Sequence, residues 1–307
     1  MEQEKKVILL AGPTASGKSK LAFHLAKNFN GEIINTDSMQ VYSVIFILTS
    51  RPNPRDTNIA KHHLYGFNSV KQKFSTGRWL KMAVSKIKEQ WDQDRIPILV
   101  GGTGLYFKAL TDGLAEIPDI PNDLRTEIRK LHKKIGQKKF YNELIKIDPL
   151  VKKFLIASDS QRSMRAYEVK KLTNKSLFAF IKKTKSNFDS NIFKKLFINT
   201  PREILHKKID KKVENMFAEG AIIEVRNFLK MKVNKELSVN KIIGIKEIKD
   251  HIDKKVTLTK TKQLIKLKTR QYAKRQFTWA RGHMRSWEMI YSPNFNDLFK
   301  QAINKIS

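Results

Sequence analysis

The chain has 307 residues, of which 40% are hydrophobic, so it is long and apolar enough for a full α/β core and one smaller domain. The absence of cysteine excludes disulfides, thiolate metal sites and a cysteine nucleophile, and it fits a reducing cytoplasm. The net charge of +32 favours a polyanionic partner, although a genome biased toward lysine codons would produce the same excess. No stretch has the length of a signal peptide or a membrane span, so we expect a cytoplasmic protein without membrane contact.

A glycine-rich loop near the N-terminus is the first functional signal. It follows the predicted strand Val7–Leu10 and opens a predicted helix that runs to about Phe29. Its spacing, G-x-x-x-x-G-K-[ST], is typical of loops whose backbone N–H groups hold a phosphate at a helix N-terminus. The predicted phosphate-binding residues are Gly12, Pro13, Thr14, Ala15, Ser16, Gly17, Lys18 and Ser19. Lys18 would reach a terminal phosphate and the Ser19 hydroxyl would hold Mg²⁺, but the motif does not identify the polyphosphate.

Asp37 follows the second predicted strand, Glu32–Asn35. Because ligands bind at the carboxyl ends of parallel strands, this carboxylate is a candidate acid, base or metal ligand. A helix N-cap is the equally weighted alternative. Residues 43–74 are predicted to be irregular. Within them, the pair His62 and His63 favours a structural or substrate-positioning role over a metal site, because no further ligand is evident.

The third predicted strand, Ile96–Val100, ends in glycines and Thr103. It follows a predicted helix from Ser75, its N-cap, to about Gln90 and precedes a helix over Leu105–Leu110. A nucleotide hydrolase or kinase would often place a carboxylate at the end of this strand. Here the strand ends in glycines, which let a ligand approach the backbone closely, and in a threonine hydroxyl. The missing carboxylate argues against an ordinary ATPase.

Helical periodicity without strands follows from about residue 112, and short helices are expected over 123–134, 138–147, 149–156 and 160–172. Arg162 and Arg165 share a helix face and could clamp a phosphate or stack on a base. A strand returns at Phe193–Asn199. We therefore predict a P-loop NTPase-like α/β core with a parallel sheet flanked by helices, formed by residues 1–115 and 193–307. An inserted all-helical domain would occupy residues 116–192.

The C-terminal part is predicted to be helical and basic. Thr200 is the expected cap of a helix over Arg202–Ala218, and a second helix is expected over Ala221–Met231. The segment Thr259–Arg281 interleaves lysines and arginines with aromatic residues. This pattern fits an RNA-binding surface as well as a solvated lysine face above an aromatic core.

Five motifs occur together and in order. They are Gly12–Ser19, Asp37–Tyr42, Gly101–Phe107, Gln161–Ala166 and Thr269–Trp279. The set resembles bacterial tRNA dimethylallyltransferases, also called tRNA isopentenyltransferases, over nearly the whole chain. The resemblance implies transfer of a dimethylallyl group from dimethylallyl diphosphate to N6 of the adenosine directly 3′ of the tRNA anticodon. It also implies Mg²⁺ as cofactor and a helical insertion that grips the anticodon stem-loop, and we expect a monomer.

The resemblance also assigns roles to residues. It implies that Asp37 takes the N6 proton, while Lys18 and Thr103 stabilise charge on the leaving diphosphate. It places these residues against tRNA: Asp37, Ser38, Met39, Gln40, Thr103, Arg125, Gln161, Arg162, Ser163, Met164, Arg165, Lys241, Gly244, Lys246, Lys274, Arg275 and Gln276.

Several positions depart from the family pattern. They are Val44 and Leu48 (usually glycine), Phe46 (usually aspartate), Ile245 (usually tyrosine), and Lys208 and Lys212 (commonly arginine). A glycine can be needed for positive φ or for close approach, so we expect an altered loop behind Asp37 and reduced activity.

Three alternatives remain open from the sequence. They are a P-loop small-molecule kinase, a transferase acting on free adenine nucleotides, and a non-catalytic tRNA-binding paralogue damaged in the loop after Asp37. The helical insertion and the basic C-terminal segment favour a large RNA over a free nucleotide.

Overall fold

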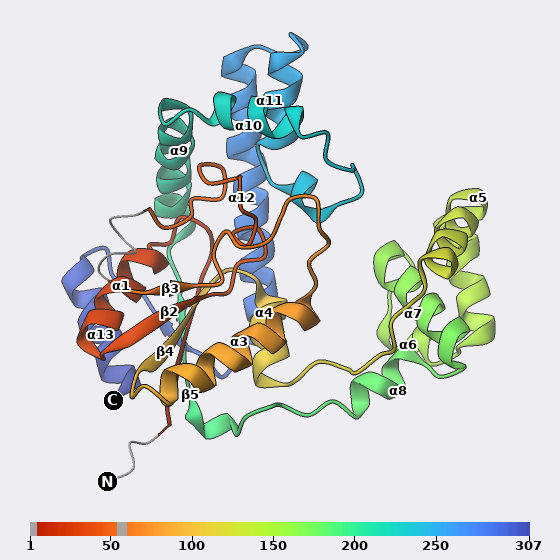
Figure 1. The fold of residues 1–307 in the computed structure, drawn as a ribbon, viewed down its shortest axis with the longest axis horizontal. Helices are drawn as coiled ribbons and strands as arrows, with labels where there is room; N and C mark the ends of the chain where they lie inside the picture. The colour runs from red at the N-terminus through yellow and green to blue at the C-terminus, as the bar shows by residue number, and fades with distance from the viewer. Residues whose placement is uncertain (1–4, 54–59) are drawn as a thin grey trace. The chain divides into compact units, whose positions relative to one another are not determined.

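The computed structural model describes residues 5–53 and 60–307 (Figure 1). The chain divides into two compact units. The core unit comprises residues 1–111 and 188–307, and the helical unit comprises residues 112–187. The boundaries expected from the sequence lie a few residues later at both junctions. Across the described ranges, every helix is too short or too polar to cross a membrane.

A six-stranded parallel sheet forms the centre of the core unit, in the order β3-β2-β4-β1-β5-β6 among the described residues. The strands are β1 (Val7–Ala11), β2 (Gly31–Asn35), β3 (His62–His63), β4 (Ile96–Gly101), β5 (Phe193–Ile198) and β6 (Glu288–Ile290). β1 and β2 are buried at every position, as expected of parallel strands covered on both faces. The predicted parallel α/β class is confirmed.

Two strands were missing from the prediction. β3 lies inside the segment expected to be irregular, and β6 lies beyond the predicted helices. Both are short edge strands, and β6 exposes two of its three residues. Such strands carry too few residues for a period-two pattern, so only pairing with β2 and β5 defines them.

Helices cover the sheet on both sides (Figure 1). α1 (Lys18–Asn28) and α13 (Phe295–Ile306) pack against Ile8, Ile33 and Ile98 in one apolar cluster. The alternate strand residues, among them Leu9, point to the opposite face, where α3 (Thr76–Trp91) and α4 (Gly104–Thr111) pack. Ser75 caps α3 as predicted.

Four helices and the loop 41–48 build a second apolar cluster beside the sheet. The helices are α9 (Arg202–Ala218), α10 (Ala221–Lys230), α11 (Ile245–Ile252) and α12 (Leu258–His283). α9 and α10 follow the predicted helices and α12 contains the basic segment 259–281, whereas α11 and α13 were not predicted. The expected cap at Thr200 is wrong, because Pro201 is the N-cap residue and the Thr200 side chain is buried behind it.

The helical unit contains α5 (Asn122–Ile147), α6 (Val151–Phe154), α7 (Ser160–Thr173) and α8 (Leu177–Lys182), packed around its own apolar cluster. α5 consists of two helical stretches that meet at Gly136, where the backbone is not helical and φ is 76°, a value that only glycine adopts easily, so the two helices predicted on either side of this position are confirmed. α8 was not predicted. The helical unit is therefore all-helical, as expected.

Candidate active site

Three sheet strands end at one edge and carry the predicted site. β1 leads into the phosphate loop, β2 into the loop of Asp37, and β4 into residues 102–103. The loops border a polar cleft of about 970 Å³, lined by Lys18, Ser19 and Arg51 among others, and an apolar cavity of about 460 Å³. Residues that line both are Thr14, Asp37, Thr49, Lys212, Met216 and Gln276. Asp37 therefore lies where a polar and an apolar ligand group could meet.

The phosphate loop has the backbone expected from its motif. Gly17 adopts φ 94° at the start of α1, and Ala15 also has positive φ. The Lys18 ammonium donates to the Pro13 carbonyl at 2.7 Å. The Ser16 hydroxyl is buried and has no hydrogen-bond partner among residues 5–53 and 60–307.

Two lysines converge on this loop. The Lys212 ammonium donates to the Thr14 hydroxyl at 3.2 Å. Burial lowers the pKa of Lys18 to about 7; the Asp37 carboxylate opposes this shift and the charge of Lys212 adds to it. Burial also lowers the pKa of Lys212, against the effect of Asp37. A bound anion would stabilise the charged form of both lysines.

Asp37 is held in a turn by the fully buried Asn35. The Asp37 N–H donates to Asn35 Oδ1 at 2.8 Å, and Asn35 Nδ2 donates to the carbonyls of Asp37 at 3.0 Å and Leu64 at 2.9 Å. Asp37 Oδ1 accepts the Met39 N–H at 2.9 Å. No helix begins at Asp37, so the helix-cap interpretation is wrong.

Thr103 joins the end of β4 to the Asp37 turn by two hydrogen bonds. Its Oγ1 accepts the Ser38 N–H at 2.9 Å, and its own N–H donates to the Thr36 carbonyl at 3.1 Å. A side-chain hydrogen bond also links Thr103 to Tyr272. Burial raises the pKa of Tyr272, and the Asp37 carboxylate raises it further, so this phenol stays protonated. Thr103 thus contacts the turn of the predicted base directly.

Comparisons with known proteins identify the family of this chain. Residues 40–283 match the family model described as IPP transferase. The chain belongs to the IPP transferase family. It is 52% identical to a tRNA dimethylallyltransferase of Pelagibacter ubique, over 94% of this chain and 92% of the relative. It is 44% identical to one of Rickettsia massiliae, over 99% of this chain and 84% of that one.

Solved structures of IPP transferases have the same fold. A tRNA isopentenylpyrophosphate transferase from Bacillus halodurans aligns with a TM-score of 0.71 and 30% identity, over 98% of this chain and 95% of that chain. A eukaryotic dimethylallyltransferase acting on tRNA aligns with a TM-score of 0.80 and 27% identity, over 93% and 73%. The resemblance found in the sequence is confirmed.

The loop that departs from the IPP transferase pattern closes without glycine. Neither Val44 nor Leu48 has positive φ. Leu48 is 6% exposed and packs on Gly244, where a Cβ would lie 2.8 Å from Leu48 Cδ2. The Glu224 carboxylate accepts the N–H groups of residues 46, 47 and 48 at 2.6, 2.7 and 3.0 Å. The expectation that this loop needs glycine for positive φ is therefore wrong.

Several predicted tRNA-facing residues lie in the core unit. Ser38, Met39 and Lys241 line the apolar cavity, and Lys246, Lys274 and Arg275 are exposed. Gln40 instead donates its side-chain amide to the carbonyls of residues 49 and 50 at 2.8 and 2.9 Å. Gly244 is buried, and its N–H donates to Glu247 at 2.8 Å. Gln40 and Gly244 therefore make hydrogen bonds within the protein at the groups that were predicted to face tRNA.

The other predicted tRNA-facing residues lie in the helical unit. Gln161 and Arg162 are exposed on α7, while Ser163 is fully buried and donates to the Asp159 carbonyl at 2.6 Å. Met164 packs against the apolar cluster of this unit. Arg125 and Arg165 flank the carboxylate of Glu168 at 3.9 and 3.4 Å.

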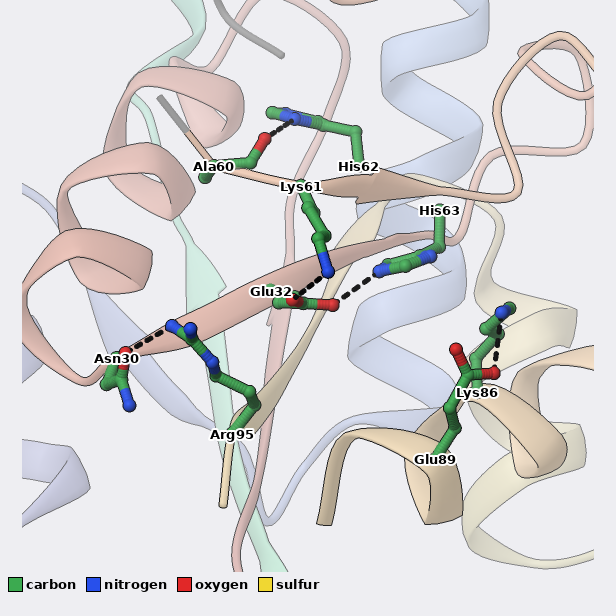
Figure 2. A network of polar contacts seen from close by, with 9 residues as sticks. All are labelled: Asn30, Glu32, Ala60, Lys61, His62, His63, Lys86, Glu89 and Arg95. Atoms are coloured by element: carbon green, nitrogen blue, oxygen red, sulfur yellow. Dashed lines mark hydrogen bonds and ion pairs between the residues drawn. The ribbon is translucent and has the colours of Figure 1, made fainter. Parts of the chain in front are cut away.

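The paired histidines form no metal site. His63 Nε2 lies 2.6 Å from the buried carboxylate of Glu32, which Lys61 also contacts at 3.4 Å (Figure 2). The His62 ring contacts the Ala60 carbonyl at 2.7 Å. Within residues 5–53 and 60–307, no three histidine, aspartate or glutamate side chains gather as metal ligands. The pair joins β3 to β2.

Two contributors to the site were missed by sequence reasoning. Glu224 closes the loop at residues 46–48 from 178 positions away in the chain, and no local pattern marks such a contact. Tyr272 was noted as an aromatic residue of the basic segment and of the fifth motif, but its contact with Thr103 was not predicted. Its place beside Thr103 depends on how α12 packs against the end of β4.

Proposed function

We propose that this chain transfers the dimethylallyl group of dimethylallyl diphosphate to N6 of the adenosine directly 3′ of a tRNA anticodon, releasing diphosphate. The position of Asp37, shared by the polar cleft and the apolar cavity, carries the proposal. The names of the relatives support the same group and the same kind of acceptor.

The two cavities suit the two substrates. The diphosphate would bind in the polar cleft, on the loop N–H groups, the Ser16 hydroxyl and the ammonium groups of Lys18 and Lys212. The dimethylallyl group and the adenine would occupy the apolar cavity, which Tyr272 and Trp279 help to line. The adenine must leave its stack to reach this cavity.

The transfer is a substitution at the allylic carbon. N6 of adenosine attacks C1 of the donor, the C1–O bond breaks, and its electron pair leaves with the diphosphate. Asp37 takes the N6 proton, a contribution of about 10²–10⁴-fold in rate. Lys18, Lys212 and the loop N–H groups stabilise the charge that gathers on the diphosphate.

We also propose Mg²⁺ as the cofactor. The Ser19 hydroxyl lines the polar cleft, and oxygen ligands beside substrate phosphates suit this ion. Bound there, Mg²⁺ would neutralise part of the diphosphate charge. The lysines and the buried Ser16 hydroxyl contribute independently of the ion.

The exposed cations supply the contacts to tRNA. Lys274 and Arg275 on α12 and Arg162 on α7 face solvent, as does the uncharged Gln161, and the whole chain carries a net charge of +32. Phosphate contacts would give affinity, and the flipped adenosine would give specificity. We propose further that the protein acts as a monomer in the cytoplasm.

Product analysis tests the proposal. The protein is incubated with unmodified tRNA, dimethylallyl diphosphate and Mg²⁺, and the digested nucleosides are examined by mass spectrometry. We expect N6-dimethylallyladenosine, and its absence would refute the function. ATP consumption in place of transfer would identify a kinase, product on free adenine nucleotides but not on tRNA would identify the nucleotide-specific transferase, and tRNA binding without product would identify a non-catalytic paralogue.

A further inference from the structure

Gln276 points into the protein, away from the exposed face of its helix. It lies on α12 next to Lys274 and Arg275, which are exposed, whereas Gln276 is 8% exposed. Its Oε1 accepts the Thr14 N–H at 2.9 Å, and its Nε2 donates to the Gly102 carbonyl at 3.0 Å. Both ends of the carboxamide are therefore occupied by backbone groups of the core unit.

The two backbone groups belong to opposite halves of the site. Thr14 lies in the phosphate loop, which would hold the leaving group. Gly102 precedes Thr103, whose hydroxyl accepts the Ser38 N–H beside Asp37. Gln276 is thus the link from the phosphate loop to the strand end that carries the turn of the base, and it lines both cavities.

The Gln276 carboxamide lies close against the backbone of Gly102, so it holds the phosphate loop at a set distance from the end of β4. A Cβ on residue 102 would lie 2.0 Å from Gln276 Nε2, so a larger residue there would displace the Gln276 carboxamide. One end of the side chain must accept and the other must donate, which a carboxamide does and neither a carboxylate nor an alkyl chain can do.

We propose that Gln276 is a positioning residue of the transfer reaction, which sets the distance between the phosphate loop and the Thr103–Asp37 side of the site. The proposal rests on the proposed function and replaces the sequence-based assignment of Gln276 to tRNA contact. Because small displacements of reacting groups strongly slow a reaction, loss of this link reduces the transfer step rather than RNA affinity.

Single-turnover transfer at saturating tRNA and donor tests this role. Gln276→Met keeps the length of the side chain but removes both hydrogen bonds. We expect the rate to fall by about 10²-fold, the affinity for inorganic diphosphate to weaken, and the affinity for tRNA to stay unchanged. The matched control is Lys274→Met, because Lys274 lies two residues before Gln276 on the exposed side of α12. This variant should weaken tRNA binding and leave diphosphate affinity intact.

Gln276→Glu separates positioning from folding. It keeps the acceptor for Thr14, but the introduced carboxyl can donate to the Gly102 carbonyl only when protonated. Its rate relative to the parent protein should therefore rise as pH falls, a response that a general loss of folded protein would not give. Thermal melting of both variants measures the folded fraction.

The outcomes separate the two proposals. An unchanged transfer rate in Gln276→Met, or weaker tRNA binding with an unchanged rate at saturation, would overturn the positioning role. A parent protein that makes no product would refute the proposed function instead. In that case unchanged diphosphate affinity in Gln276→Met would also show that Gln276 does not hold the phosphate loop.

Discussion

The Lys212 ammonium donates to the Thr14 hydroxyl at 3.2 Å, and its charge helps to lower the pKa of Lys18 on the same loop. Two lysines thus lie at the proposed diphosphate site, where burial works against the charged form of each. Binding of the proposed diphosphate would favour the charged form that burial disfavours.

Diphosphate binding should therefore take up a proton. The pKa of Lys18 is lowered to about 7, so its amine is largely neutral above that pH in the free protein. A bound anion favours the charged form, and affinity should fall as pH rises above about 7, by up to about tenfold per pH unit. Calorimetry with inorganic diphosphate in buffers of different ionisation enthalpy measures the uptake. Lys18→Arg stays charged and should lose the Lys18 part of it, and equal uptake in both proteins would contradict the assignment.

Asp37→Asn should separate chemistry from binding. An asparagine can keep the contacts of the turn made through the main chain and Oδ1, but it cannot accept the N6 proton. We expect transfer to fall by at least about 10²-fold while tRNA affinity is retained. Single-turnover kinetics and filter binding give the two values. Near-normal transfer would remove Asp37 from the role of base.

Restoring the usual glycine at position 48 should destabilise this protein. Leu48 is buried in the second apolar cluster, so Leu48→Gly should lower the free energy of unfolding by about 2–5 kcal/mol. Val44→Gly is the matched control, because Val44 is 42% exposed and should cost about 1 kcal/mol or less. Urea unfolding compares them. Equal stability of the two variants would mean that Leu48 contributes little to the core.

Affinity for tRNA should depend steeply on salt. The logarithm of the association constant should fall linearly with the logarithm of salt concentration, with a slope of about −0.7 to −0.9 for each phosphate contact. Arg162→Met and Lys274→Met should each reduce this slope by about one unit. Titrations from low to high salt provide the measurement. A flat dependence would show that the net charge of +32 does not reflect a binding surface.

The sequence was sufficient to predict those parts of the site that are formed by residues adjacent in the chain. The phosphate loop is contiguous, and its glycine, lysine and serine spacing is readable because a strand and a helix flank it directly. Asp37 was found because it follows a buried strand at the edge where parallel strands bind ligands. The helix α9 was predicted over its whole length, whereas α12 was recognised only as a basic segment with interleaved aromatic residues.

Only the tertiary structure decided which partners distant residues have. Thr14 and Gln276 are 262 positions apart, and Leu48 and Glu224 are 176 apart, so neither contact leaves a local pattern. The same α12 exposes Lys274 and buries Gln276, and the helix packing determines which of the two can meet RNA. The sequence by itself determined the phosphate loop, the candidate base and the parallel α/β class, because each depends on adjacent residues. The packing of α12 on the strand ends decided how the two halves of the site are joined, because hydrogen bonds between remote segments exist only after the chain has folded.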